Sequence, residues 1–204
     1  MRPTYPGLAD ALRGNPTRPV SLDAQFEQIL AAMKAAAAAL RDGGIPFALA
    51  GGLAVYARGG PPTEHDVDFL IREEDVGRAV ELLGAAGFRA ERPPEGWLYK
   101  VYDENDSMID LIFAPNNRPE RVAAILDRAT DLEVYAITLP VMTATDVLES
   151  KLRTLKEHEA SYDDVLEIAR TCREQIDWES LRQNVDSPYA KAFFTLAEEL
   201  GLTS

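Results

Sequence analysis

The order of the apolar patterns along the chain constrains its fold more than any other feature. Up to about residue 114, short apolar runs typical of strands alternate with helical periodicity, and the last two runs are separated by the turn-rich segment 103–106. Beyond Pro140 the periodicity is helical throughout. This order predicts an α+β fold in which a small mixed β-sheet is flanked by helices.

Three regions are expected from the pattern. Residues 1–20 are rich in proline and are predicted to form an irregular N-terminal arm. Residues 21–140 are predicted to form an α/β core, and residues 141–204 a helical subdomain packed on that core. Strands are expected at 45–50, 66–71, 88–91, 97–102, 107–114 and 132–138.

The composition excludes several classes of protein. The 204 residues include 34 acidic and 21 basic side chains, which gives a net charge of −13. Indiscriminate binding to nucleic acid is disfavoured because that affinity comes from Lys and Arg neutralising phosphates. No apolar run is long enough to cross a bilayer, and the first residues lack the pattern of a secretion signal. We therefore expect a cytoplasmic protein without a membrane partner.

Three carboxylates stand out in the predicted sheet. Asp66 and Asp68 share one face of their strand, because side chains alternate between faces, and Asp110 interrupts an apolar strand further on. If the two strands are near neighbours, the three carboxylates lie within about 5 Å and repel one another unless a cation neutralises them. Oxygen ligands of this kind favour Mg²⁺ or Mn²⁺ over zinc. The alternative is that these aspartates only form turns.

A glycine pair lies between the first predicted strand and the helix after it. Gly51 and Gly52 would let a phosphate approach the backbone at the start of that helix. A tight turn between strand and helix explains the pair equally well.

Together these motifs resemble the nucleotidyltransferase superfamily typified by DNA polymerase beta. Its members combine a Gly-Gly or Gly-Ser turn, a D-x-D strand and a third acidic residue on a neighbouring strand. Within that superfamily, residues 45–170 look most like the small bacterial transferases related to AbiEii-type toxins. The later motifs of those toxins, a lysine in the helix after the sheet and an aspartate one helix further on, are matched by Lys151 and Asp164.

The resemblance implies a nucleotidyltransferase fold and a reaction. A nucleoside monophosphate would pass from a nucleoside triphosphate such as ATP to an acceptor hydroxyl, with Mg²⁺ or Mn²⁺ as cofactor. The residues implied as catalytic and metal-binding are Asp66, Asp68 and Asp110. The residues implied in nucleotide binding are Gly51, Gly52, Lys151 and Asp164.

The acceptor stays open at this stage. The toxin-like relatives modify tRNA or protein and pair with an antitoxin, whereas other relatives modify cationic antibiotics such as aminoglycosides. An RNA acceptor would need a basic surface, for which the candidates are Arg58, Arg72, Lys100, Arg118 and Arg121. The net charge favours a cationic small molecule or a protein over RNA. A further alternative is a non-catalytic protein that binds nucleotide or a partner.

Overall fold

The computed structural model of the chain describes residues 22–61, 67–156 and 160–203. Its centre is a seven-stranded mixed sheet with the strand order β3-β4-β5-β2-β1-β7-β6. Neighbouring strands are antiparallel except for the parallel pairs β2–β5 and β1–β7. The strands are β1 (Phe47–Leu49), β2 (Val67–Ile71), β3 (Arg89–Glu91), β4 (Leu98–Tyr102), β5 (Met108–Ile112), β6 (Thr130–Val134) and β7 (Ile137–Val141).

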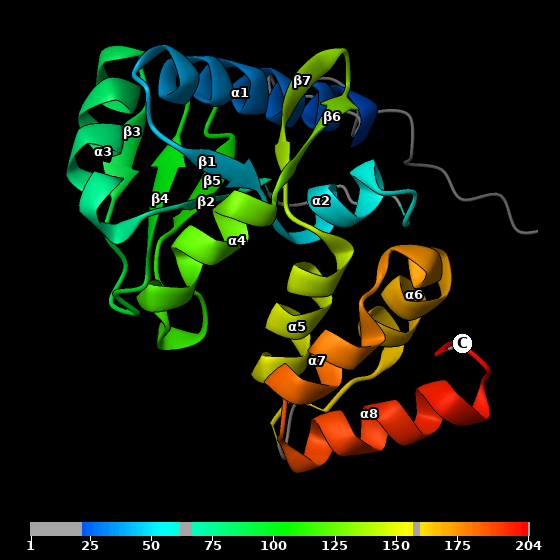
Figure 1. Ribbon diagram of the computed structural model, residues 1–204. Coiled ribbons are helices and arrows are strands. Elements are labelled where there is room, and N and C mark those ends of the chain that lie inside the picture. The colour runs from blue at the N-terminus through cyan, green and yellow to red at the C-terminus, as the bar shows by residue number, and fades with distance from the viewer. Residues whose placement is uncertain (1–21, 62–66, 157–159, 204) are drawn as a thin grey trace, which may run out of the picture.

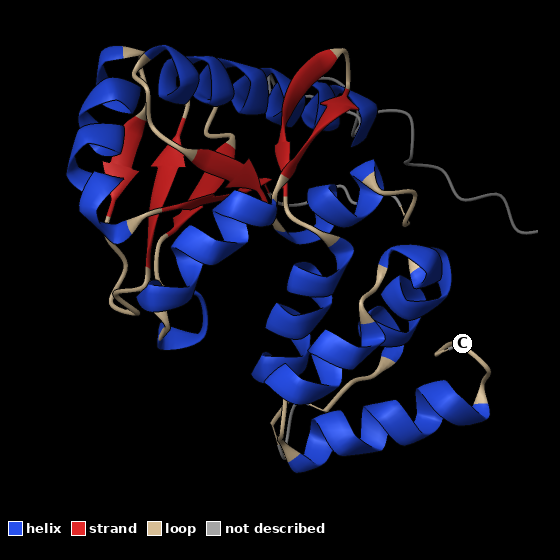
Figure 2. Ribbon diagram, viewed as in Figure 1, coloured by secondary structure: helices blue, strands red, loops and turns tan. Residues whose placement is uncertain are grey.

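Helices surround this sheet and continue beyond it (Figures 1 and 2). The α-helices are α1 (Leu22–Asp42), α2 (Gly51–Ala57), α3 (Val76–Ala85), α4 (Val122–Arg128), α5 (Ala144–Thr154), α6 (Asp163–Thr171), α7 (Trp178–Asn184) and α8 (Pro188–Glu199). The short 3₁₀ turns are η1 (Glu73–Asp75), η2 (Pro115–Asn117), η3 (Pro119–Arg121) and η4 (Arg173–Gln175). The protein is thus a mixed α+β structure, as predicted.

The alternation of side chains in β2 and β5 decides which face of the sheet carries polar groups. Phe69, Ile109 and Leu111 are fully buried in the hydrophobic core. Asp68 and Asp110 alternate with them and therefore lie on the opposite face. The helix α1 contributes its alanine-rich stretch to the core, where Ala36 and Ala37 are fully buried. The apolar pattern thus leaves one face of β2 and β5 available for a site.

One predicted strand is wrong. Residues 132–138 were expected to form a single strand, but the structure has the antiparallel hairpin β6–β7 there. Its turn is made by Tyr135 and Ala136, which have φ angles of 48° and 66°. Two-residue hairpin turns need such positive φ values and usually use Asn or Gly. The turn was missed because neither residue carries that signal.

The last four helices follow the sheet directly. The helix α5 begins after β7, where the Thr143 side chain accepts a hydrogen bond of 3.1 Å from the Asp146 backbone. Figure 1 shows α5 to α8 grouped at one end of the sheet, and Phe193 is fully buried among them. The predicted arm, residues 1–20, lies outside the described residues. Within the described ranges, every helix is too short or too polar to cross a bilayer.

Candidate active site

Two of the three predicted carboxylates lie side by side in the sheet. Asp68 on β2 and Asp110 on β5 are register partners on parallel neighbouring strands, which are about 4.8 Å apart in a sheet. Lys100 on β4 is the register partner of Asp110 on the other side. Asp66, the third predicted carboxylate, lies outside the described residues. One row across three strands therefore carries two acids and one base.

The base of this row is bound to its neighbour. Lys100 Nζ donates hydrogen bonds of 3.1 Å and 3.4 Å to the two carboxylate oxygens of Asp110. The side chains of Lys100 and Asp110 are 30% and 16% exposed, so the pair is partly shielded from water. The ammonium group offsets one of the two negative charges that Asp68 and Asp110 bring together.

Gly51 makes room for the carboxylate of Asp68. A Cβ atom added at position 51 would lie 1.8 Å from Asp68 Oδ2, which is far inside contact distance. Gly51 also has a φ angle of +58°, a conformation that other residues adopt at a cost. The glycine pair opens α2 itself, whereas the sequence placed it before the helix. Only glycine at position 51 allows this approach of backbone and carboxylate.

A cleft opens beside this carboxylate. It is lined by residues of the sheet, of the connection between β5 and α4, and of α5. Gly51, Asp68 and Lys151 are among its lining residues, so the cleft brings together three of the residues predicted from the sequence. Apolar side chains, among them Leu70 and Ile112, also line the cleft.

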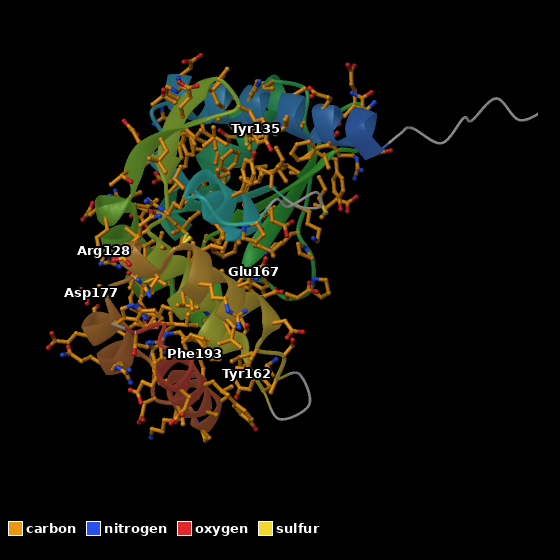
Figure 3. The ribbon with its side chains drawn as sticks, turned by 90° about the vertical axis from the view of Figure 1, so that its right-hand side faces the viewer. Arg128, Tyr135, Tyr162, Glu167, Asp177 and Phe193 are labelled. Atoms are coloured by element: carbon orange, nitrogen blue, oxygen red, sulfur yellow. The ribbon has the colours of Figure 1, made fainter. Side chains whose placement is uncertain are left out.

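A second, shallower hollow lies on the other flank of Lys151. Its lining includes Gly52, Lys151, Asp164 and Glu167. Lys151 Nζ donates a hydrogen bond of 3.1 Å to Asp164 Oδ2. In Figure 3 Glu167 lies at the middle height of the molecule, below Tyr135 and above Phe193 and Tyr162. The four residues predicted to bind nucleotide therefore lie along these two adjoining hollows.

The donor atoms of the site suit a hard divalent cation. Among the described residues, no three or more His, Cys, Asp or Glu side chains are grouped to hold a metal. Asp68 and Asp110 nevertheless supply carboxylate oxygens from adjacent positions of one face, and such oxygens are the ligands that Mg²⁺ and Mn²⁺ prefer. These two residues fit the metal that the sequence predicts.

Two carboxylates of α5 that the sequence analysis missed also reach the cleft. Asp146 and Glu149 line it although their side chains are only 3% and 5% exposed. Arg128 Nη2 lies 2.6 Å from Asp146 Oδ1, and Glu149 is bound by both Arg121 and Arg153. Acids three residues apart in a helix are common, so the sequence held no signal that set them apart.

Three of the five basic residues predicted for an RNA surface contact other parts of the protein. Arg58 Nη2 donates to the backbone oxygen of Val141 at 2.9 Å, and burial lowers the pKa of its guanidinium group. Lys100 and Arg121 bind carboxylates, as described above. Arg72 has its Nε atom buried without a hydrogen-bond partner among the described atoms. Arg118 is exposed and lines the cleft.

The sequence was compared with protein families and with curated proteins. Residues 17–200 match the model of a family described as uncharacterised nucleotidyltransferase. No curated protein matches the sequence.

Solved structures show a similar fold. The crystal structure of ANT(2″)-Ia in complex with adenylyl-2″-tobramycin aligns with a TM-score of 0.56 and 12% identity, over 83% of this chain and 98% of that one. The solution structure of ANT(2″)-Ia, described there as an antibiotic-resistance factor, aligns with a TM-score of 0.57 and 15% identity, over 87% and 96%. The mixed sheet with its flanking helices is therefore a nucleotidyltransferase fold.

Proposed function

The chain belongs to this family of nucleotidyltransferases, and from that membership we propose that it transfers a nucleoside monophosphate from a nucleoside triphosphate to an acceptor hydroxyl. The acceptor oxygen would form a bond to the α-phosphorus, the bond from that phosphorus to the bridging oxygen would break, and pyrophosphate would leave. A divalent cation, Mg²⁺ or Mn²⁺, is part of the proposal.

The observation that carries the proposal is the juxtaposition of Asp68 and Asp110. They are register partners on parallel strands, and Asp68 faces a cleft bordered by Gly51 and Lys151. We propose that these two carboxylates, together with Asp66, hold the metal. The chemistry such a metal supplies is activation of the attacking hydroxyl and neutralisation of charge on the leaving pyrophosphate.

The surrounding residues would prepare the site for its substrates. Lys100, bound to Asp110 at 3.1 Å, holds that carboxylate in place and offsets its charge before any substrate arrives. The missing side chain at Gly51 leaves space for the Asp68 carboxylate. A group held in its working position in advance loses less entropy at the moment of reaction.

The nucleotide would bind in the second hollow and where that hollow meets the cleft. Lys151 lines both, and its side chain is 35% exposed, so a phosphate can approach it. We propose that Lys151 exchanges its contact with Asp164 for the triphosphate and that Gly52 gives the phosphates access to the backbone. A role as the toxin of a toxin–antitoxin pair rests on the resemblance to AbiEii-type proteins, and growth arrest on induced expression would test it.

Label transfer tests the proposed reaction directly. The protein is incubated with each α-³²P nucleoside triphosphate and Mg²⁺ or Mn²⁺, and in turn with total tRNA, lysate protein and an aminoglycoside panel. We expect one acceptor class to become labelled, and the label to be absent with Asp68→Ala. The matched control is Glu81→Ala, an exposed acid of α3. Absence of label with every acceptor, or equal label with Asp68→Ala, would contradict the proposal.

A further inference from the structure

An excess of positive charge surrounds the cleft, although the chain carries a net charge of −13. Three arginines line it: Arg118 before η3, Arg121 in η3 and Arg153 in α5. A fourth, Arg128 at the end of α4, lies next to them through its ion pair with Asp146. We call this group the arginine cluster. The acids bound to it are Asp146, paired with Arg128, and Glu149, paired with Arg121 and Arg153. The cleft lining thus holds four cationic side chains, the three arginines and Lys151, against the three carboxylates of Asp68, Asp146 and Glu149.

The arginines are close enough to act on one another. Burial lowers the pKa of Arg121, and the positive charges of Arg153 and Arg118 lower it further. Burial also lowers the pKa of Arg153, whose side chain is 19% exposed. Positive charges close together in a partly buried site repel one another more strongly than in water, because the dielectric constant is lower there. An anionic ligand would relieve this repulsion.

The connection that carries Arg118 is fixed in place. Asn116 and Asn117 both have positive φ angles, 55° and 57°, in the turn that follows β5. Asn116 Nδ2 donates a hydrogen bond of 3.3 Å to Ser150 Oγ, which ties the turn to α5. The guanidinium group of Arg118 makes no hydrogen bond or ion pair with another residue of the described ranges and stays exposed at the rim of the cleft. The backbone that carries Arg118 is thus held in place, while no acid of the described residues neutralises its guanidinium group.

We propose that Arg118, Arg121 and Arg153 form a phosphate-binding subsite of the cleft that opens beside Asp68. All three line this cleft, and guanidinium groups bind phosphate oxygens through paired, charge-assisted hydrogen bonds. The inference rests on the proposed function in one respect, since the phosphate would belong to one of the two substrates. Its source is either the nucleoside triphosphate or a phosphate-bearing acceptor such as RNA.

The subsite also bears on the choice of acceptor. A polycationic aminoglycoside would meet the positive charge of Arg118 at the rim, whereas an acceptor with phosphates would be attracted. The local charge of the cleft therefore opposes the preference that the net charge of the whole chain suggested. Local charge decides at contact distance because fields from distant groups are screened by salt.

Binding without metal tests the subsite separately from catalysis. The wild-type protein, Arg118→Ala and Arg118→Glu are titrated in EDTA with three probes: inorganic tripolyphosphate, ATP and an RNA hairpin that lacks a triphosphate. We expect about a tenfold loss of affinity for Arg118→Ala and a larger loss for Arg118→Glu, with a shallower dependence on salt. Arg170→Ala, which removes an exposed arginine of α6, is the matched control and should bind as the wild type does.

The probes distinguish the sources of the phosphate. A loss confined to tripolyphosphate and ATP assigns the subsite to the nucleoside triphosphate, and a loss confined to the hairpin assigns it to the acceptor. Equal affinities for wild type and Arg118→Glu, or no binding of any probe by the wild type, would overturn the inference. Asp68→Ala should keep metal-free phosphate binding while losing transfer. Phosphate binding through Arg118 in a wild-type protein that transfers no nucleotide would count against the proposed function alone.

Discussion

Two pairs of carboxylates lie around the same cleft and differ in how their charge is compensated. The sheet pair is Asp68 and Asp110, with Lys100 bound to Asp110. The helix pair is Asp146 and Glu149, which are 3% and 5% exposed and are bound by three arginines. The two acids of the helix pair are almost fully buried, whereas the side chain of Asp110 in the sheet pair is 16% exposed. Three arginines bind the two acids of the helix pair.

Under the proposed function, this difference separates a structural carboxylate from a reactive one. An ion pair between a buried acid and one or two guanidinium groups is costly to break, and the acid has little further affinity for a cation. An acid that faces a cleft, beside a second acid, attracts a cation from solution because two like charges lie close together. Both pairs consist of carboxylates, so their surroundings and not their chemical group distinguish them.

The largest effect is expected for Asp68→Ala. Transfer should fall by about 10³-fold or more, because charge stabilisation at the reacting phosphate would be lost. The free energy of unfolding should change by less than about 1 kcal/mol, since removing one of two adjacent acids also relieves repulsion. Label transfer and urea denaturation measure the two quantities. Normal turnover by this variant would mean that the sheet pair is not the catalytic one.

The converse result is expected for Glu149→Ala. Removing the shared partner of Arg121 and Arg153 leaves two partly buried cations unpaired, and the free energy of unfolding should fall by about 3–5 kcal/mol. Urea denaturation measures this, with Glu81→Ala as a control that should stay within about 0.5 kcal/mol of the wild type. A loss below about 1 kcal/mol would remove the distinction between the pairs.

Divalent cations should stabilise the protein through the sheet pair alone. At ten times its dissociation constant, a ligand that binds only the folded state adds about 1.4 kcal/mol. Thermal melting in Mg²⁺ or Mn²⁺ should therefore show a higher Tm for the wild type, and EDTA should reverse the shift. Asp68→Ala should show no shift. An equal shift in that variant would place the cation elsewhere in the molecule.

The smallest effect on stability is expected for Lys151→Ala. Its ion pair with Asp164 is largely exposed, with the Asp164 side chain 76% accessible, so the free energy of unfolding should change by less than about 1 kcal/mol. The KM for the nucleoside triphosphate should nevertheless rise by about tenfold, because one charge-assisted contact to phosphate is lost. Steady-state kinetics measure this, and an unchanged KM would exclude Lys151 from nucleotide binding.

The sequence could predict the sheet pair but not the helix pair, for a physical reason. In a strand, an acid between buried apolar neighbours such as Ile109 and Leu111 is conspicuous, because the period of two fixes which face it joins. In α5, acids and bases near the cleft look like an ordinary solvated helix face. Their burial depends on Arg121 in η3 and Arg128 at the end of α4, whose pairing with these acids cannot be read from spacing alone.

Two further predictions from the sequence failed because they depended on an unusual turn or on a contact between distant segments. The hairpin β6–β7 was missed because its turn residues, Tyr135 and Ala136, hold positive φ angles without Gly or Asn. Arg58 was predicted for an RNA surface, yet it binds the backbone of Val141, far along the chain. Each of these contacts joins segments whose proximity is set by the whole fold.

The space that Gly51 leaves for Asp68 makes the geometry of this site sensitive to a single substitution. A single methyl group at position 51 would collide with the carboxylate 1.8 Å away, without altering any charge. Under the proposed function, the exchange of Gly51 for alanine would stop nucleotide transfer without removing an acid or a base.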